Sequence, residues 1–429
     1  MASLGVTVAA ASALRLVFST TPLPSLVQHR IELSSPLVSY SRLQEGYHLL
    51  THLDPPLNPY STAAFHGPPL LVALVGPLTA LPPYATHALW TAVDAATAWA
   101  LARIAQRRTR GTLLEDQGEK MWSGAAVAAL YLFHPFSLLT TLARSSVVFS
   151  NLFVALALES ALSGSLIPAV FFLSLATHFS LYPLLFLPPV ILLAYQFSSP
   201  LPPTTSQPAP TKRSFRSFAL ESAAAFGAHQ AALLGLSRHL TGNWDFLSSA
   251  YGVILTIPDL TPNIGLAWYF FIEMFDHFRA FFLVVFALHP VAYVAPLTYF
   301  YRGDPLFAVT LLVGATSLLK SYPTLGDWAL FHALLACFSE LLPYVQAPLF
   351  HLLLPLHALL LLPTFHHLWL YSGSGNANFF YASTLVWAVA MGGWVVEAVK
   401  ARGRREVALG LGEEGRGKVG AGTWGVVQR

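Results

Sequence analysis

Residues 304–320 read DPLFAVTLLVGATSLLK, an apolar run that carries charge only at its two ends. Such a run is typical of a helix that is buried in a membrane protein. Working outward from it, apolar stretches of similar character recur along the chain at about 4–19, 68–82, 84–104, 122–142, 146–163, 165–178, 180–196, 217–237, 265–288, 290–301, 304–320, 325–342, 347–365 and 379–398. Because several are too short to cross a bilayer upright, we expect about 11 to 13 crossings, with some segments paired, tilted or re-entrant.

The overall composition leads to the same class. Of the 429 residues, 55% are apolar and only 10% are charged, whereas a soluble domain has roughly 25% charged residues. The mean hydropathy of +0.57 leaves too little polar material to cover the surface of soluble domains. We therefore predict an all-α polytopic membrane protein with about 12 transmembrane helices. The net charge of +3 gives almost no support to nucleic-acid binding.

Basic residues form three short clusters, at 103–110, 212–216 and 400–405. The positive-inside rule places all three in the cytosol. Residues 198–216 are rich in Pro, Ser and Thr and are predicted to be a cytosolic linker between the halves of one membrane domain, 1–398. Residues 399–429, first basic and then rich in Gly, are predicted to be a disordered cytosolic tail. The side of the N-terminus stays open, because the number of early crossings is not fixed by the sequence.

Catalytic groups are hard to find in this sequence. A transferase for lipid-linked sugars needs a pair of carboxylates, but Glu32, Glu45 and Asp54 are widely spaced. The single cysteine, Cys337, lies in an apolar stretch and is expected to pack in the core, and it excludes a disulfide framework. We therefore predict no catalytic residue.

The sixteen histidines also give no clear metal site. Two imidazoles on one helix face need a spacing of four residues, and the densest group lacks that spacing and has no accompanying carboxylate; it comprises His351, His357, His366 and His367. We predict neither a metal nor another cofactor.

Acidic residues inside or at the ends of the apolar stretches should each face a protein neighbour, a polar cavity or the interface; they are Asp94, Glu159, Glu221, Glu273 and Asp276. Glu273, Asp276 and His277 have the spacing of one helix face. Two readings stay open: this face makes buried hydrogen bonds to other helices, or it lines a cavity for a polar lipid headgroup. Arg279 follows and could meet a phosphate.

Residues 372–381, SGSGNANFFY, place two amides beside small residues and directly before an apolar stretch. Asn376 and Asn378 would lie near a helix start, where backbone N–H groups and amides can bind phosphate or sugar hydroxyls. An ordinary N-cap after a glycine turn explains the same pattern, and spacing alone does not decide between the two.

Three long segments together resemble the phosphatidylinositol-glycan class U family, the U subunit of GPI transamidase. They are 242–278, with YGVILTIPDLTPNIGLAWYFFIEMFDHF from Tyr251; KSYPTLGD from Lys320; and HLWLYSGSGNANFFY from His367. Weaker similarity extends through Ser34-Ser-Pro-Leu, Glu45-Gly, Asn58-Pro-Tyr-Ser and Phe65-His, in the same order.

The resemblance implies a multi-pass protein of the endoplasmic reticulum membrane, similar to the membrane portion of multi-span mannosyltransferases of GT-C type. It implies a non-catalytic subunit that binds the GPI glycolipid, with Asn376 and Asn378 in contact with it. Transamidation itself would belong to a caspase-like subunit among its partners. Charge near the interface suggests further phospholipid contacts at Lys212 and Arg213.

Two alternatives remain. An active glycosyltransferase that uses a dolichol-linked sugar would need Glu32, Glu45 and Asp54 clustered in one wet cavity. A transporter would show two related halves with facing acids, and we find no internal repeat. The sequence does not reveal which helices meet which partner, or whether the chain also recognises the precursor's signal peptide.

Overall fold

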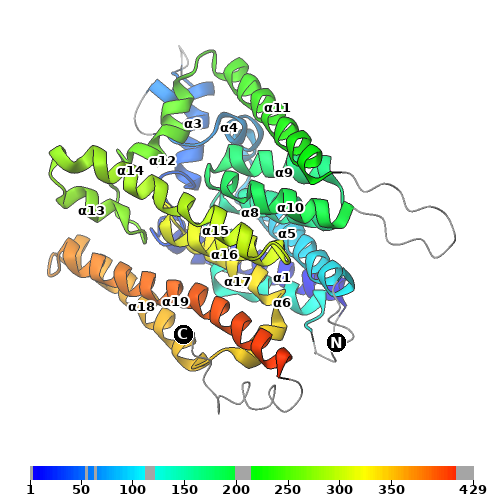
Figure 1. The fold of residues 1–429 in the computed structure, drawn as a ribbon. Coiled ribbons are helices and arrows are strands. Elements are labelled where there is room, and N and C mark those ends of the chain that lie inside the picture. The colour runs from blue at the N-terminus through cyan, green and yellow to red at the C-terminus, as the bar shows by residue number, and fades with distance from the viewer. Residues whose placement is uncertain (1–2, 54–56, 62–64, 112–120, 199–213, 412–429) are drawn as a thin grey trace.

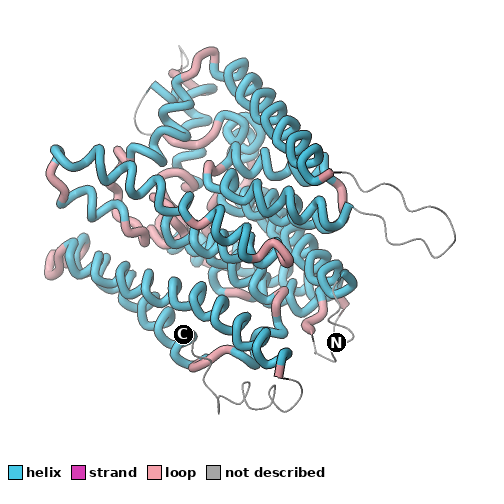
Figure 2. Tube along the Cα trace, viewed as in Figure 1, coloured by secondary structure: helices cyan, strands magenta, loops and turns pink. Residues whose placement is uncertain are grey.

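Helices make up the regular structure of the described chain, and no strand occurs in it (Figure 2). The computed structural model describes all residues except 1–2, 54–56, 62–64, 112–120, 199–213 and 412–429. The expected linker and most of the expected tail, with Lys212 and Arg213, therefore lie outside the described residues. The prediction of an all-α membrane protein is confirmed at the level of its class.

The elements follow one another as short and long helices (Figure 1). The first half comprises α1 (Leu4–Ser19), α2 (Leu23–Val27), α3 (Tyr40–Thr51), α4 (Pro69–Val75), α5 (Pro83–Gly111), α6 (Gly124–Phe133), α7 (Pro135–Leu142), α8 (Val147–Leu162), α9 (Leu166–Phe179) and α10 (Leu187–Ser198). The second half comprises α11 (Phe215–Thr241), α12 (Val253–Thr256), α13 (Ala267–Glu273), α14 (Asp276–Ala292), α15 (Val294–Phe300), α16 (Pro305–Leu319), α17 (Leu325–Ala336), α18 (Pro348–Leu370) and α19 (Ala377–Gly410). Single 3₁₀ or π turns lie at Pro59–Ser61, Gly76–Ala80, Tyr182–Phe186, Leu247–Gly252 and Ser339–Tyr344.

Three helical stretches of the described chain are long and apolar enough to cross a membrane: Asp276–Phe300, Pro348–Leu370 and Ala377–Gly410. A fourth forms if the bent pair α6 and α7 counts as one span. Other apolar helices are shorter than a span. Helix α16 is buried from Pro305 to Ser317, as expected for a helix that is apolar on all sides. The expected total of about 12 crossings stays a prediction.

Two of the predicted stretches are divided differently in the structure. Stretch 122–142 bends by 55° between α6 and α7, because Pro135 holds His134 in an extended conformation and begins the next helix. Stretch 265–288 breaks after Glu273, and its second part joins 290–301 in the span Asp276–Phe300. Helix α19 continues through the basic residues 400–405 to Gly410, so the expected domain end at 398 falls inside a helix.

Two of the basic clusters, 103–110 and 400–405, meet at one end of the molecule, because Arg108 and Arg402 both lie near Asp304. Arg108 of α5 pairs with Glu340 at 2.5 Å, and Arg402 of α19 pairs with Asp304 at 2.8 Å. The end of α10 lies beside them, because Gln196 Nε2 donates to the carbonyl oxygen of Arg302 at 2.6 Å. We call this region, around Arg108, Arg302, Asp304, Glu340 and Arg402, the basic end. The side of the membrane that these clusters face stays a prediction.

Candidate functional site

The turn between α18 and α19 lies at the end opposite the basic end, and we call residues 371–378 the asparagine turn. Gly373 has φ +63°, a left-handed conformation that suits glycine. Asn376 is the N-cap of α19, and its Oδ1 accepts a hydrogen bond from the Phe379 N–H at 3.2 Å. Both Asn376 and Asn378 are exposed. The N-cap reading is therefore confirmed for Asn376, while the cap leaves its amide group available to a ligand.

Helix α13 holds the asparagine turn in place. The Tyr269 hydroxyl donates to Oδ1 of Asn378, and the Tyr381 hydroxyl donates to the carbonyl oxygen of Leu266 at 3.1 Å. The rings of Tyr269 and Tyr381 lie 4.7 Å apart. A segment more than one hundred residues earlier in the chain thus fixes the position of Asn378.

An aromatic cluster supports the turn from below; it comprises Trp268, Tyr269, Trp369, Phe380 and Tyr381. Trp268 is its centre, with ring centroids 5.7 Å from Phe380 and 6.1 Å from Trp369, and none of its surface is exposed. Its indole N–H is buried and has no hydrogen-bond partner among the described residues. The cluster fixes α13, α18 and α19 to one another with apolar and ring contacts.

The side chain of Arg279 in α14 makes hydrogen bonds to backbone carbonyl groups. Its guanidinium donates to the carbonyl oxygens of Phe271 at 3.3 Å, Thr256 at 3.4 Å and Ile257 at 2.8 Å. These bonds satisfy the carboxyl end of α12, where Ile257 has φ +46°. Arg279 therefore ties α12 to α13, and its contact with a lipid phosphate stays a prediction.

The expectation of one helix face for Glu273, Asp276 and His277 is wrong. Helix α13 ends at Glu273, residues 274 and 275 are extended, and α14 begins at Asp276. All three side chains are exposed. Asp276 in the first turn of α14 complements the positive end of that helix, which favours a new start there over continuation of α13. Their role in lining a cavity has no support from a shared face.

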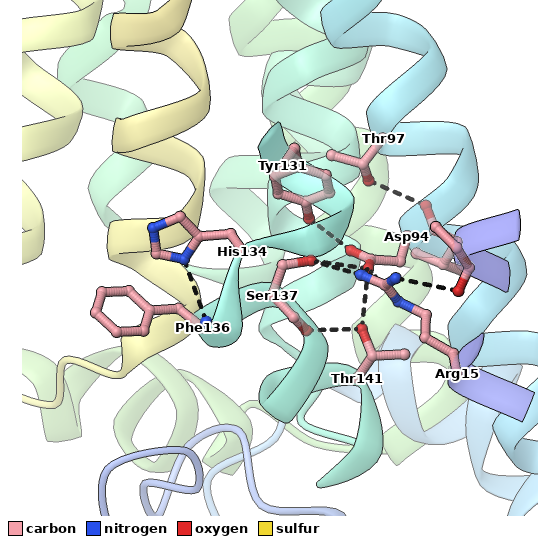
Figure 3. Close-up of polar contacts among 10 residues, drawn as sticks. Arg15, Asp94, Thr97, Tyr131, His134, Phe136, Ser137 and Thr141 are labelled. Carbon is pink, nitrogen blue, oxygen red and sulfur yellow. Dashed lines mark hydrogen bonds and ion pairs between the residues drawn. The ribbon is translucent and has the colours of Figure 1, made fainter. Parts of the chain in front are cut away.

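A buried polar centre around Arg15 and Asp94 is the main feature of the structure that the sequence analysis did not predict (Figure 3). Arg15 of α1 donates through Nε and Nη2 to Oδ2 of Asp94 of α5, at 3.1 and 2.7 Å. Ser137 and Thr141 of α7 donate to the same oxygen at 2.9 and 3.1 Å, and Tyr131 of α6 donates to Oδ1 at 2.6 Å. Arg15 and Asp94 are opposite charges that each lie in an apolar stretch of the sequence. That pattern was the signal from which their pairing could have been predicted.

A second cluster fixes the loop that leads into α13. Asp259 lies 3.3 Å from Arg42 of α3 and 3.7 Å from His66, and it accepts hydrogen bonds from the Thr261 N–H at 2.9 Å and hydroxyl at 2.5 Å. The Tyr322 hydroxyl donates to the carbonyl oxygen of Asp259 at 2.8 Å. Burial favours the neutral acid, but His66, Thr261 and Arg42 outweigh it and lower the pKa of Asp259 from its ordinary value of 3.8.

Replacing Asp259 by Asn should therefore loosen this loop at neutral pH. A lowered folded-state pKa contributes stability that is present above pH 3.8 and is lost as the pH falls through the folded-state value. We expect faster proteolysis of residues 257–266 in the variant at pH 7, with a weaker dependence on acid than in the parent chain. Asp245→Asn, which removes an exposed carboxylate from the neighbouring loop, is the matched control. Equal cleavage of the parent and the Asp259→Asn variant at pH 7 would contradict the assignment.

Comparison with known proteins adds the family. A family described as GPI transamidase subunit PIG-U matches residues 9–387. The chain belongs to the PIG-U family. It is 34% identical to the human "GPI-anchor transamidase component PIGU" over 395 residues, which cover 87% of this chain and 88% of that protein. It is 32% identical to "GPI transamidase component GAB1" of Saccharomyces cerevisiae, with 87% and 88% covered, and 30% identical to the GAB1 homolog of Schizosaccharomyces pombe, with 90% of each covered.

The resemblance to the PIG-U family is thereby confirmed, and its match includes the asparagine turn and the buried polar centre. It ends at residue 387, so the basic part of α19 lies beyond the matched region. The chain is an α-helical membrane protein of this family.

The carboxylates considered for the glycosyltransferase alternative lie in different environments in this PIG-U family member. Glu32 is buried and accepts two hydrogen bonds from Arg30, at 3.1 and 2.8 Å, and Glu45 is exposed on α3. Asp54 lies outside the described residues. Cys337 is buried, as expected, and its thiol donates to the carbonyl oxygen of Ala333. In the described part of the chain, His, Cys, Asp and Glu side chains form no group of three or more that could hold a metal.

Proposed function

We propose that the chain is a non-catalytic subunit of GPI transamidase in the endoplasmic reticulum membrane, which binds the GPI glycolipid and presents it for attachment to precursor proteins. Family membership supports the role in GPI attachment. The same proposal includes about 12 crossings and a likeness to the membrane portion of mannosyltransferases. It also includes contacts with membrane phospholipids and partnership with the other subunits, among them the caspase-like one.

The observation that carries the lipid-binding part is the construction of the asparagine turn. Two exposed amides lie at the start of α19, above a packed aromatic cluster and beside the Tyr269 hydroxyl. Amides and hydroxyls bind phosphate and sugar oxygens, while aromatic rings present an apolar body with a polar edge at a membrane interface. A glycolipid needs both kinds of contact at one place.

Binding of this kind would act through proximity. Holding the ethanolamine amine of GPI beside an activated carboxyl group on a neighbouring subunit makes the attack effectively intramolecular. No residue of this chain needs to form a covalent bond in that scheme, and binding energy serves placement.

Asn376→Ser combined with Asn378→Leu tests the proposal, since Ser keeps the N-cap of α19 while both amides are removed. At limiting GPI, attachment to a reporter precursor should fall about tenfold, the effect of losing two ligand hydrogen bonds of modest strength. Saturating GPI should restore much of the rate, because the loss is one of binding.

Ser372→Leu is the matched control, because it adds the same apolar bulk to the same exposed turn and removes no amide. Co-purification of the partner subunits should be unchanged in both variants. Unchanged attachment at limiting GPI would remove the asparagine turn from the binding site. A loss of partner subunits would instead assign it to assembly.

A further inference from the structure

An apolar groove lies at the basic end, far along the molecule from the asparagine turn. Its volume is about 730 Å³, and helices α10, α11 and α15 form its walls. The walls carry Leu187 and Ile191 of α10, Ala219 and Ala223 of α11, and Val294 and Ala295 of α15. A groove of this size and character is suited to an apolar ligand or ligand segment. Along α15 its lining runs from Val294 to Tyr299, about 7.5 Å of helix rise, and Arg302 lines it just beyond the end of that helix.

Two arginines lie close to the apolar lining of this groove: Arg302 is part of the lining, and Arg216 follows the lining residue Phe215 on α11. Arg302 is exposed, and its guanidinium carbon lies 4.7 Å from the ring centroid of Tyr299, which also lines the groove. Arg216 is exposed on α11, directly after the lining residue Phe215. The stacking on Tyr299 and a hydrogen bond of 3.1 Å to its carbonyl oxygen hold the Arg302 side chain at the groove edge.

These two cations differ from the other arginines near the basic end. Most of the others face a carboxylate: Arg103 and Arg107 pair with Glu159, Arg108 with Glu340, Arg402 with Asp304, and Arg404 with Glu397. In the described part of the chain, no ion pair involves Arg302 or Arg216. Glu221 is also on α11, but helical spacing places it on the side away from Ala219 and Ala223.

We propose that this groove binds an anionic glycerophospholipid, with one acyl chain between α10, α11 and α15 and the phosphate at Arg302 and Arg216. The positive-inside rule makes this the cytosolic leaflet, where anionic lipids and exposed arginines attract each other. A guanidinium binds a phosphate through paired, charge-assisted hydrogen bonds. An apolar helix of a partner would fill the groove but leave both cations without a counter-charge, so the lipid fits the observations better.

Photo-crosslinking in phosphatidylcholine nanodiscs tests this inference on the full chain. Trace phosphatidylserine with a diazirine on one acyl chain is the probe, and the same label on phosphatidylcholine is the reference. Peptides of α10 and α15 that line the groove should be labelled about fivefold more by the serine lipid, the factor that one cation at a membrane surface contributes. Unlabelled phosphatidylserine should compete, and unlabelled phosphatidylcholine should not.

Arg302→Gln should remove most of this preference, since only Arg216 would remain, and Arg302→Lys should keep most of it. Lys400→Gln, which removes an exposed charge near the same end but away from the groove, is the matched control and should change nothing. Ala295→Trp fills the groove and should abolish labelling of both lipids; its melting temperature checks that it folds. Equal labelling by the two probes, or no effect of Arg302→Gln, would overturn the inference.

The last part of the experiment repeats the crosslinking on the assembled complex. Purified with its partner subunits, the chain should be labelled at the same peptides. Labelling that disappears on assembly would overturn the proposal, because it would show that a partner helix occupies the groove. GPI attachment is not the readout, so this result is separate from the fate of the proposed function.

Discussion

Asp94→Leu is expected to destabilise the chain by about 3–5 kcal/mol, the usual cost of leaving one member of a buried ion pair without its partner. The side chains of Arg15 and Asp94 are each 1% exposed. Removal of the carboxylate would leave the Arg15 guanidinium buried and would also take the acceptor from Tyr131, Ser137 and Thr141. The measurement is the denaturation midpoint of the purified chain in detergent, compared with that of the parent.

The double variant Arg15→Met with Asp94→Leu separates charge from packing. It removes both charges and keeps similar volume, so it should recover most of the lost stability. Asp94→Asn should lie between, because the amide can still accept hydrogen bonds but carries no charge. A double variant less stable than Asp94→Leu would show that the two charges do not depend on each other.

Trp268→Ala is expected to have the second large effect. Truncation of a fully buried Trp costs about 3–5 kcal/mol, and here it would empty the centre of the aromatic cluster between α13, α18 and α19. Because Tyr269 and Tyr381 would lose their support, the exposed asparagine turn should become more mobile and be cleaved faster by protease. Limited proteolysis at residues 371–376 and the denaturation midpoint are the two measurements.

Trp268→Phe is the informative companion. The indole N–H has no hydrogen-bond partner among the described residues, so Phe removes an unpaired buried donor while it keeps most ring contacts. We expect a loss below about 1.5 kcal/mol, as for a swap of similar shape. A loss as large as that of Trp268→Ala would mean that the N–H has a partner in the assembled protein.

Composition predicted the class of the protein because the shortage of charged residues is a property of the whole chain. The pairing inside it could not be predicted in the same way. Arg15 and Asp94 are 79 residues apart, and their meeting depends on how α1, α5, α6 and α7 pack. The sequence marks both residues as costly in an apolar setting, but only the fold brings them together.

Prediction of the candidate site residues from the sequence was also limited to features that depend on local structure. The SGSGN segment indicated a turn and a helix start, and it left open whether Asn376 serves as the N-cap or binds a ligand; the structure shows that Asn376 is the N-cap. The break between Glu273 and Asp276 gave no such signal, because neither Gly nor Pro lies there. Tyr269 was not predicted as the neighbour of Asn378, since that contact depends on tertiary packing between α13 and α19.

Helix α19 has a mechanical consequence that follows from its length. It runs for 34 residues beside α18 and joins the asparagine turn to the ion pair of Arg402 with Asp304 (Figure 1). At 1.5 Å per residue this is a rod of about 51 Å. From the ion pair at Arg402 to the helix start at Ala377 the arm is about 38 Å, so a tilt of about 5° about the ion pair would move that start by about 3 Å. Any tilt of α19 at the ion pair would therefore be transmitted to the asparagine turn as a displacement.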